Sequence, residues 1–156
     1  MSLDITIREA RTGDVSALLR HRRGMYEAMG YTEAAALEEM ALTSENFLER
    51  ALADGTLRAW LAQSGGRVVA GAGILISPWP SHPYDQQCRR ATILNMYVEP
   101  EFRRRGIARR LMQIMIEWCR KEGFVNVQLH ASDQGRPLYE SLGFRPTNEM
   151  QLKLRS

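Results

Sequence analysis

The sequence predicts a single-domain α/β (α+β) protein with a mixed sheet of about six to seven strands flanked by helices. In the first half, two apolar strands at residues 57–63 and 67–77 are separated by Ser64-Gly65-Gly66, which is typical of an antiparallel hairpin. In the second half, strands alternate with helices, and such an alternation requires crossover connections and parallel strands. A length of 156 residues suits one domain with a proper core.

Local start and stop signals place the other elements. Glycines end three of the expected helices, at Gly55, Gly123 and Gly143, and Thr12 or Asp14 can cap the first helix. The expected helices run from this cap to about residue 23 and over residues 33–40, 43–54, 106–122 and 136–142. The other expected strands are residues 5–8, 88–98, 125–130, and finally Phe144 and 150–154, which close the sheet.

Composition and charge exclude several classes of function. The net charge is only +3, and much of the positive excess lies at residues 103–110, which favours a local anionic ligand over a broad nucleic-acid surface. Two distant cysteines and three histidines show no metal-ligand spacing, so we expect no bound metal. No signal peptide or membrane span is visible, so we expect a cytoplasmic protein without a membrane or nucleic-acid partner.

A basic turn between a strand and a helix is the most informative stretch. The apolar run 93–98 leads through Glu99-Pro100 into Arg103-Arg104-Arg105-Gly106, and an amphipathic helix follows. A helix N-terminus carries unpaired N–H groups and the positive end of the helix dipole, so it attracts anions. Because Gly106 has no Cβ, a ligand can approach its backbone closely. The stretch predicts a phosphate cradle, although three adjacent arginines alone are also typical of a solvated surface.

Two motifs in this half of the chain resemble those of a known family. The pattern Arg103-x-x-Gly106-x-Ala108 resembles the acyl-CoA pyrophosphate loop of the GCN5-related N-acetyltransferase (GNAT) family. The block Pro137-Leu-Tyr-Glu-Ser-Leu-Gly-Phe144 resembles the C-terminal signature of the same family. The resemblance is close over residues 93–144 and only architectural before them. It implies a strongly twisted mixed sheet whose fourth and fifth strands, residues 88–98 and 125–130, splay apart to admit the cofactor.

The resemblance also implies an activity and its site. The chain would transfer an acetyl group from acetyl-CoA, its acyl-donor substrate, directly to a primary amine in a ternary complex. The implied cofactor-binding residues are Met96, Tyr97, Val98, Arg103, Arg104, Arg105, Gly106, Ile107, Ala108 and Arg109. The pantetheine arm would pair with the main chain of residues 96–98, where a backbone N–H would stabilise the oxyanion. Tyr139 would be the catalytic acid that protonates the departing thiolate.

Several points stay open at the level of sequence. The acceptor is a small-molecule or peptide amine of unspecified identity, and residues 21–31 and 78–84 are the expected walls of its pocket. Glu99 and Glu27 are candidate general bases, and Tyr139 has an alternative interpretation as a core aromatic residue. The acyl-chain preference is unreadable, and a homodimer is compatible with the family. The alternative function is a non-catalytic CoA- or anion-binding module of the same fold.

Overall fold

The computed structural model describes residues 4–155, and its strands and helices follow the predicted order closely. The strands are β1 (Ile5–Glu9), β2 (Leu57–Ser64), β3 (Arg67–Pro78), β4 (Arg89–Val98) and β5 (Val127–Leu129). The helices are α1 (Val15–Ala28), α2 (Ala34–Asp54), α3 (Ile107–Lys121) and α4 (Arg136–Ser141), with short 3-10 turns at η1 (Thr12–Asp14) and η2 (Pro100–Phe102). None of these helices combines the length and the apolar character that crossing a membrane requires.

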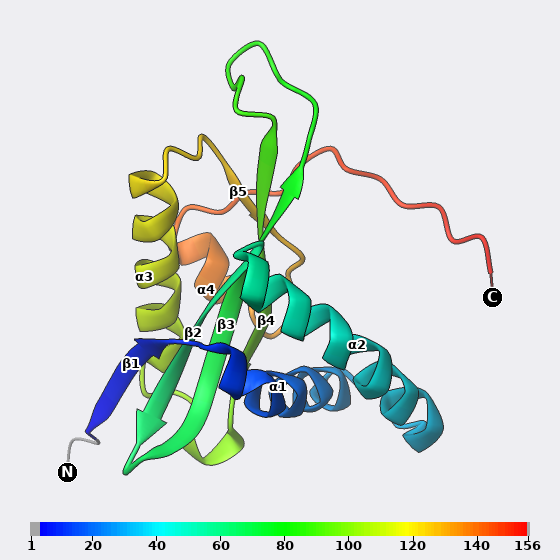
Figure 1. Cartoon of the computed structure of the whole chain (residues 1–156), viewed down its shortest axis with the longest axis vertical. Helices are drawn as coiled ribbons and strands as arrows, with labels where there is room; N and C mark the ends of the chain where they lie inside the picture. Colours follow the sequence, from blue (N-terminus) through cyan, green and yellow to red (C-terminus); the bar gives the residue numbers. More distant parts are fainter. Residues whose placement is uncertain (1–3, 156) are drawn as a thin grey trace.

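The five strands form one mixed sheet in the order β1-β2-β3-β4-β5. The first four strands are antiparallel neighbours, whereas β4 and β5 are parallel, which confirms the predicted crossover through α3. Helices α1 and α2 cover one face, and α3 and α4 cover the other (Figure 1). The strand count is five rather than six to seven, because Phe144 and residues 150–154 form no strand in the described chain.

Helix α2 corrects a second prediction, since residues 34–54 form one helix and not two. The predicted break lies just before Thr43, at which a new helix would begin. Instead, Thr43 Oγ1 donates to the carbonyl of Glu39 at 3.0 Å or of Met40 at 3.1 Å, both in the preceding turn. Its polar group is therefore satisfied inside a continuous helix. The helix ends as predicted at Gly55, which adopts φ 79°.

A bulge in β4 shifts the alternation of its side chains by one residue. Odd-numbered residues face α3 before the bulge, and even-numbered residues face it after the bulge. Gly73 pairs with Leu94 but Gly71 pairs with Tyr97, so β4 has one extra residue across from Ala72. The extra residue lies at Asn95, whose φ of 61° is left-handed. Ala91 and Ile93 before the bulge, and Met96 and Val98 after it, all pack on the α3 side.

Asn95 and Tyr97 consequently turn toward α1. The Asn95 amide is buried and donates from Nδ2 to the Leu18 carbonyl at 3.0 Å. The Tyr97 ring lies against Gly24 in the middle of α1, so closely that a Cβ there would be 2.6 Å from Tyr97 Cζ. The helix therefore needs glycine at this position to let the aromatic ring seat against its backbone.

The parallel pairing of β4 with β5 is short. It joins residues 91–93 to residues 127–129 and goes no further, so within residues 4–155 no strand pairs with residues 94–98 on that side. The two strands separate beyond this point, in agreement with the predicted splay. An open edge of β4 thus leads from the bulge to the turn that precedes α3.

We expect Gly24→Ala to destabilise the fold by about 1–3 kcal/mol, because the new methyl group overlaps the Tyr97 ring. An ordinary helical glycine would behave oppositely, since alanine is favoured there by about 1 kcal/mol. Urea unfolding measures the difference. Gly13→Ala is the control, because a Cβ at Gly13 meets nothing within 4 Å.

The same experiment in a Tyr97→Leu background tests the cause. If the ring is responsible, the cost of Gly24→Ala should largely disappear in that background, as a double-mutant cycle would show. A stabilising Gly24→Ala, or an unchanged cost without the tyrosine ring, would show that α1 and β4 do not meet in this way.

Candidate active site

The turn between β4 and α3 presents a row of unpaired backbone amides. Arg104 and Gly106 have left-handed backbones, with φ of 62° and 79°. The first amide that bonds within the helix is that of Arg110, which donates to the Gly106 carbonyl at 3.1 Å. The N–H groups of residues 107–109 precede this first bond and have no acceptor in the helix. Together with the helix dipole they form an anion site.

Space above this row is open. A Cβ built on Gly106 would meet nothing within 4 Å, and the residue is exposed, so a phosphate can approach its backbone directly. Ile107, by contrast, is only 2% exposed and anchors the start of α3 in the core. Its predicted role in cofactor binding can therefore come only from its amide. Half-buried Ala108 is small enough to leave the adjacent amides accessible.

The three arginines of the turn, Arg103, Arg104 and Arg105, are exposed, as is Arg109 in the first turn of α3. None of the four forms an ion pair with a carboxylate in residues 4–155. Arg103 folds back, donates from Nε to the Val98 carbonyl at 2.8 Å and lies over the Tyr97 ring at 5.5 Å. Arg109 donates to Ser141 Oγ at 2.9 Å and so joins the start of α3 to α4. Their positive charge remains available to an anionic ligand.

The open edge of β4 offers main-chain groups. The Glu99 N–H donates to the Val69 carbonyl at 2.9 Å, so it points toward β3. In an extended strand the preceding carbonyl, that of Val98, then points the opposite way, which is where Arg103 reaches it. The side chains of Met96 and Val98 pack in the core beneath α3. The three predicted residues of this strand can therefore offer a ligand their backbone, while their side chains hold the strand in place.

Tyr139 lies on α4 and belongs to the same core cluster as Met96 and Val98. It is 8% exposed, and its ring centroid is 6.1 Å from that of Phe144. Burial raises the pKa of its hydroxyl, so the group keeps its proton at physiological pH. Within the described chain the hydroxyl forms no hydrogen bond, and it is not one of the fully buried unpaired polar atoms. Tyr139 thus packs as a core aromatic residue and still carries an uncommitted proton.

The two candidate bases are already engaged. Glu99 is 8% exposed and forms ion pairs with Arg67 and, at 3.7 Å, with Arg20. Glu27 pairs with Arg23 at 3.5 Å. A proton acceptor should be free to receive a proton, and each of these carboxylates would first have to break an ion pair.

Two polar residues lie near the bulge: Asn95, which the sequence prediction of the site did not include, and His21, which it included only as the first residue of the acceptor wall 21–31. Asn95 carried a signal that could have identified it, because asparagine tolerates a left-handed backbone better than the apolar residues around it. His21 carried none. It is fully buried with both ring nitrogens unpaired, and its ring centroid is 5.6 Å from that of Tyr97. Burial, with a smaller contribution from Arg20, lowers its pKa to about 4, so the imidazole is neutral at physiological pH.

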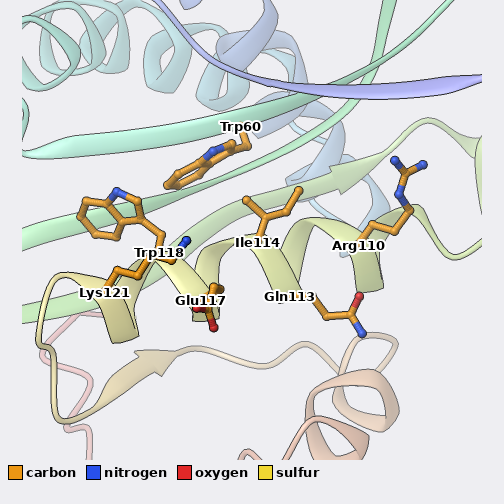
Figure 2. A pocket seen from close by; sticks show the side chains of 7 residues that line it. All are labelled: Trp60, Arg110, Gln113, Ile114, Glu117, Trp118 and Lys121. Atoms are coloured by element: carbon orange, nitrogen blue, oxygen red, sulfur yellow. The ribbon is translucent and has the colours of Figure 1, made fainter.

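Two hollows on the surface are not lined by residues 103–106 of the turn. One, about 510 Å³, lies on the flank of α3 that faces β2, beside the adjacent rings of Trp60 and Trp118 (Figure 2). Another, about 290 Å³, lies between the loop around Trp79 and β5. Of the two predicted acceptor walls, residues 78–84 line the second hollow and residues 21–31 line neither. The two walls do not meet around one hollow, because the loop that contains residues 78–84 projects from the N-terminal end of β4 (Figure 1). Residues 4–155 contain no group of three or more side chains suited to hold a metal.

Comparisons with known proteins agree with this geometry. The profile of the Acetyltransferase (GNAT) family matches residues 23–144. A crystal structure of a GCN5-related N-acetyltransferase from Ralstonia eutropha JMP134 is 34% identical, with a TM-score of 0.90 over 96% of this chain and 98% of that one. A predicted acetyltransferase from Clostridium acetobutylicum, solved with acetyl-CoA, is 26% identical, with a TM-score of 0.87 over 96% of both chains.

A relative with a named acceptor is the glucosamine 6-phosphate N-acetyltransferase of Trypanosoma brucei brucei. It is 29% identical over 154 residues, which are 97% of this chain and 96% of that protein. The matching family and these relatives are all named as acetyltransferases, which argues against the alternative of a non-catalytic CoA- or anion-binding module. With its amide-lined arginine turn and open β4 edge, the chain belongs to the GNAT family and is an acyl-CoA-dependent N-acetyltransferase.

Proposed function

We propose that this enzyme transfers an acetyl group from acetyl-CoA directly to the amine of a small acidic molecule in a ternary complex. The observation that carries the proposal is the continuity between two features. The unpaired amides and arginines of the turn lie at the same end of β4 as its open edge. An elongated ligand with a pyrophosphate at one end and an amide-containing arm can use both at once.

The cofactor would be held mainly by backbone groups. Its pyrophosphate would accept hydrogen bonds from the amides of residues 107–109, with Arg103, Arg104, Arg105 and Arg109 supplying charge. Its pantetheine arm would pair with the main chain of residues 96–98 as a strand would. Since Arg103 Nε donates to the Val98 carbonyl at 2.8 Å, the arm would have to displace that guanidinium or use the neighbouring groups.

The chemistry would be a single acyl transfer. The amine nitrogen attacks the thioester carbonyl, a backbone N–H near residues 96–98 stabilises the oxyanion, and the C–S bond breaks. Tyr139 gives its proton to the departing thiolate, for which a raised pKa is suitable because the acid stays protonated. The amine must lose a proton as well. With Glu99 and Glu27 in ion pairs, water is the proposed route for it.

Arg22 supports an acidic acceptor. Its guanidinium lies on the α1 side of the bulge, where Nη1 donates to Asn95 Oδ1 at 3.5 Å and Nη2 to Tyr26 Oη at 3.3 Å. No carboxylate in residues 4–155 pairs with it, unlike its neighbour Arg23, which pairs with Glu38 at 3.1 Å. A half-buried cation with only neutral partners is suited to bind a carboxylate or phosphate on the acceptor. The phosphosugar acceptor in the name of the trypanosomal relative is consistent with this choice.

Gly106→Ala should weaken acetyl-CoA binding strongly, because its methyl group would enter the open space above the amide row. At about one hundred times its dissociation constant, acetyl-CoA should stabilise the wild-type fold by roughly 2.7 kcal/mol. The corresponding melting shift is on the order of 5–10 °C. We expect most of this shift to be lost in the variant, as measured by thermal unfolding with and without acetyl-CoA.

Gly55→Ala is a matched control for backbone strain. Gly55 and Gly106 share φ 79° with ψ of 6° and 8°, and a Cβ added to either of them would meet nothing within 4 Å. Both substitutions should therefore cost about 1–2 kcal/mol of stability. Only the change at Gly106 should reduce the acetyl-CoA shift. An equal shift in both variants would mean that the pyrophosphate lies elsewhere.

Tyr139→Phe should lower kcat by about a hundredfold to ten-thousandfold, the usual contribution of a general acid. The ring remains, so its packing against Phe144 and the affinity for acetyl-CoA should change little. Single-turnover release of free thiol measures the chemical step without interference from product release. A wild-type rate in this assay would leave Tyr139 with a packing role alone.

Arg22→Ala should raise KM for amines that carry a carboxylate or phosphate by roughly 10- to 100-fold, the loss expected for a charged hydrogen bond. KM for neutral amines should stay nearly unchanged. Arg23→Ala is the control, since this neighbouring arginine is already paired with Glu27 and Glu38. Equal effects of Arg22→Ala on acidic and neutral amines would exclude recognition of an acidic group by Arg22.

A further inference from the structure

The loop that precedes α4 contains a glycine whose backbone does not require one. Gly135 is the N-cap of α4, with φ −83° and ψ −23°, a conformation that every residue adopts readily. A serine, asparagine or aspartate side chain at an N-cap accepts a hydrogen bond from the first helical turn and stabilises the helix. Gly135 makes no such contribution, so space and not conformation is the reason for glycine at this position.

The Tyr139 ring occupies the space that a side chain of Gly135 would need. A Cβ added to Gly135 would be 2.8 Å from Cε2 of Tyr139 and 3.2 Å from Cζ, the carbon that carries the hydroxyl. Non-bonded carbon atoms attract best at about 3.5–4.0 Å, so both contacts would be repulsive. A methyl group at residue 135 would therefore press against the end of the ring that carries the proton proposed for the departing thiolate.

Hydrogen bonds fix Gly135 in front of the ring. Its N–H donates to Ser132 Oγ at 3.1 Å, and its carbonyl accepts from the Tyr139 N–H at 3.2 Å. The Arg136 N–H donates to the Ser132 carbonyl at 2.9 Å. The added Cβ would also be 3.2 Å from Ser132 Oγ, so a methyl group would be confined between the serine hydroxyl and the tyrosine ring.

The core limits how far the ring can move. Tyr139 is 8% exposed, and its ring meets that of Phe144 at an interplanar angle of 63°. The Phe144 N–H donates to the Tyr139 carbonyl at 3.1 Å, which keeps the two residues together. Because a close-packed core has few voids, the ring could not yield to a methyl group without displacing its neighbours.

We propose that Gly135 is a positioning residue, whose missing side chain sets where the Tyr139 hydroxyl lies and so how its proton reaches the departing sulfur. The inference rests on the proposed role of Tyr139 as the acid, and Gly135 itself neither binds substrate nor transfers a proton. A ring held between the loop 132–135 and the core delivers its proton in one place. A displacement on the order of 1 Å can lower a rate by about a hundredfold.

Gly135→Ala should lower the single-turnover rate of thiol release by roughly 10- to 100-fold, with a dissociation constant for acetyl-CoA within about threefold of the wild type. The overpacking should also lower the melting temperature by roughly 3–10 °C. Gly13→Ala is the matched control, because a Cβ at Gly13 meets nothing within 4 Å. The control should leave the rate and the dissociation constant unchanged.

The same substitution in a Tyr139→Phe background identifies the cause. Phenylalanine keeps Cε2 and Cζ but has no hydroxyl, so Gly135→Ala should lower the melting temperature there as before and cause no further loss of rate. An equal loss of rate in both backgrounds would overturn the proposal, since the methyl group would then not act through the hydroxyl. A wild-type rate in Gly135→Ala beside a slow Tyr139→Phe would also overturn it and leave the acid in place. A wild-type rate in Tyr139→Phe would instead reject the acid, and the proposal with it.

Ser132→Ala tests the same loop without adding an atom. It removes the hydroxyl that accepts from the Gly135 N–H, so the loop loses its anchor beside the ring, and thiol release should slow by about 3- to 10-fold. If far-UV spectra show that Gly135→Ala is unfolded at the assay temperature, this second variant decides. A wild-type rate in Ser132→Ala would then overturn the proposal.

Discussion

The left-handed backbone at Asn95 is the constraint on which the rest of the site depends. One extra residue in β4 reverses the side-chain alternation at mid-length, while β4 stays paired with β3 on both sides of the bulge. Before the bulge, β4 also pairs with β5. After it, Tyr97 packs on α1, and no strand of the described chain pairs with the edge of β4 that faces away from β3. The buried Asn95 amide, bonded to the Leu18 carbonyl, stabilises this arrangement by satisfying a polar group in the core.

The bulge at Asn95 and the arginine turn that ends at Gly106 lie at opposite ends of one short segment of the chain. The turn concentrates unpaired N–H groups and positive charge, which attract a phosphate group without any side chain having to be buried for it. The open edge supplies hydrogen-bonding groups in a fixed, extended geometry. Because the short 3-10 turn η2 connects the open edge of β4 to the arginine turn, the backbone and not flexible side chains sets the distance between these two binding features. Such preorganisation favours binding of one elongated ligand in one orientation.

The close packing of α1 against the bulge in β4 leaves a destabilising feature in the core around His21. Among the described residues no group forms a hydrogen bond to either ring nitrogen, and an unpaired polar group in the core destabilises the fold. Its neighbour Gly71 has no room for a side chain, because a Cβ there would be 3.1 Å from His21 Nδ1 and 2.7 Å from a Leu61 methyl group. Small residues in β3 and glycine in α1 thus let helix α1 approach the bulge closely. Functional sites commonly retain such local cost where the surrounding packing can offset it.

The sequence by itself determined the elements whose signals are local: the hairpin at residues 64–66, the helix end at Gly55, the arginine turn and the helix that follows it. These depend on turn residues, caps and amphipathic spacing within a few positions. Tertiary structure decided the bulge at Asn95, the burial of His21 and the continuity of α2 at Thr43, because each depends on groups that pack or bond against it in the folded chain. The same reason explains residues 150–154. The strand predicted there from the alternation is wrong, because a strand forms only where a partner edge is available, and the alternation contains no information about where that edge lies.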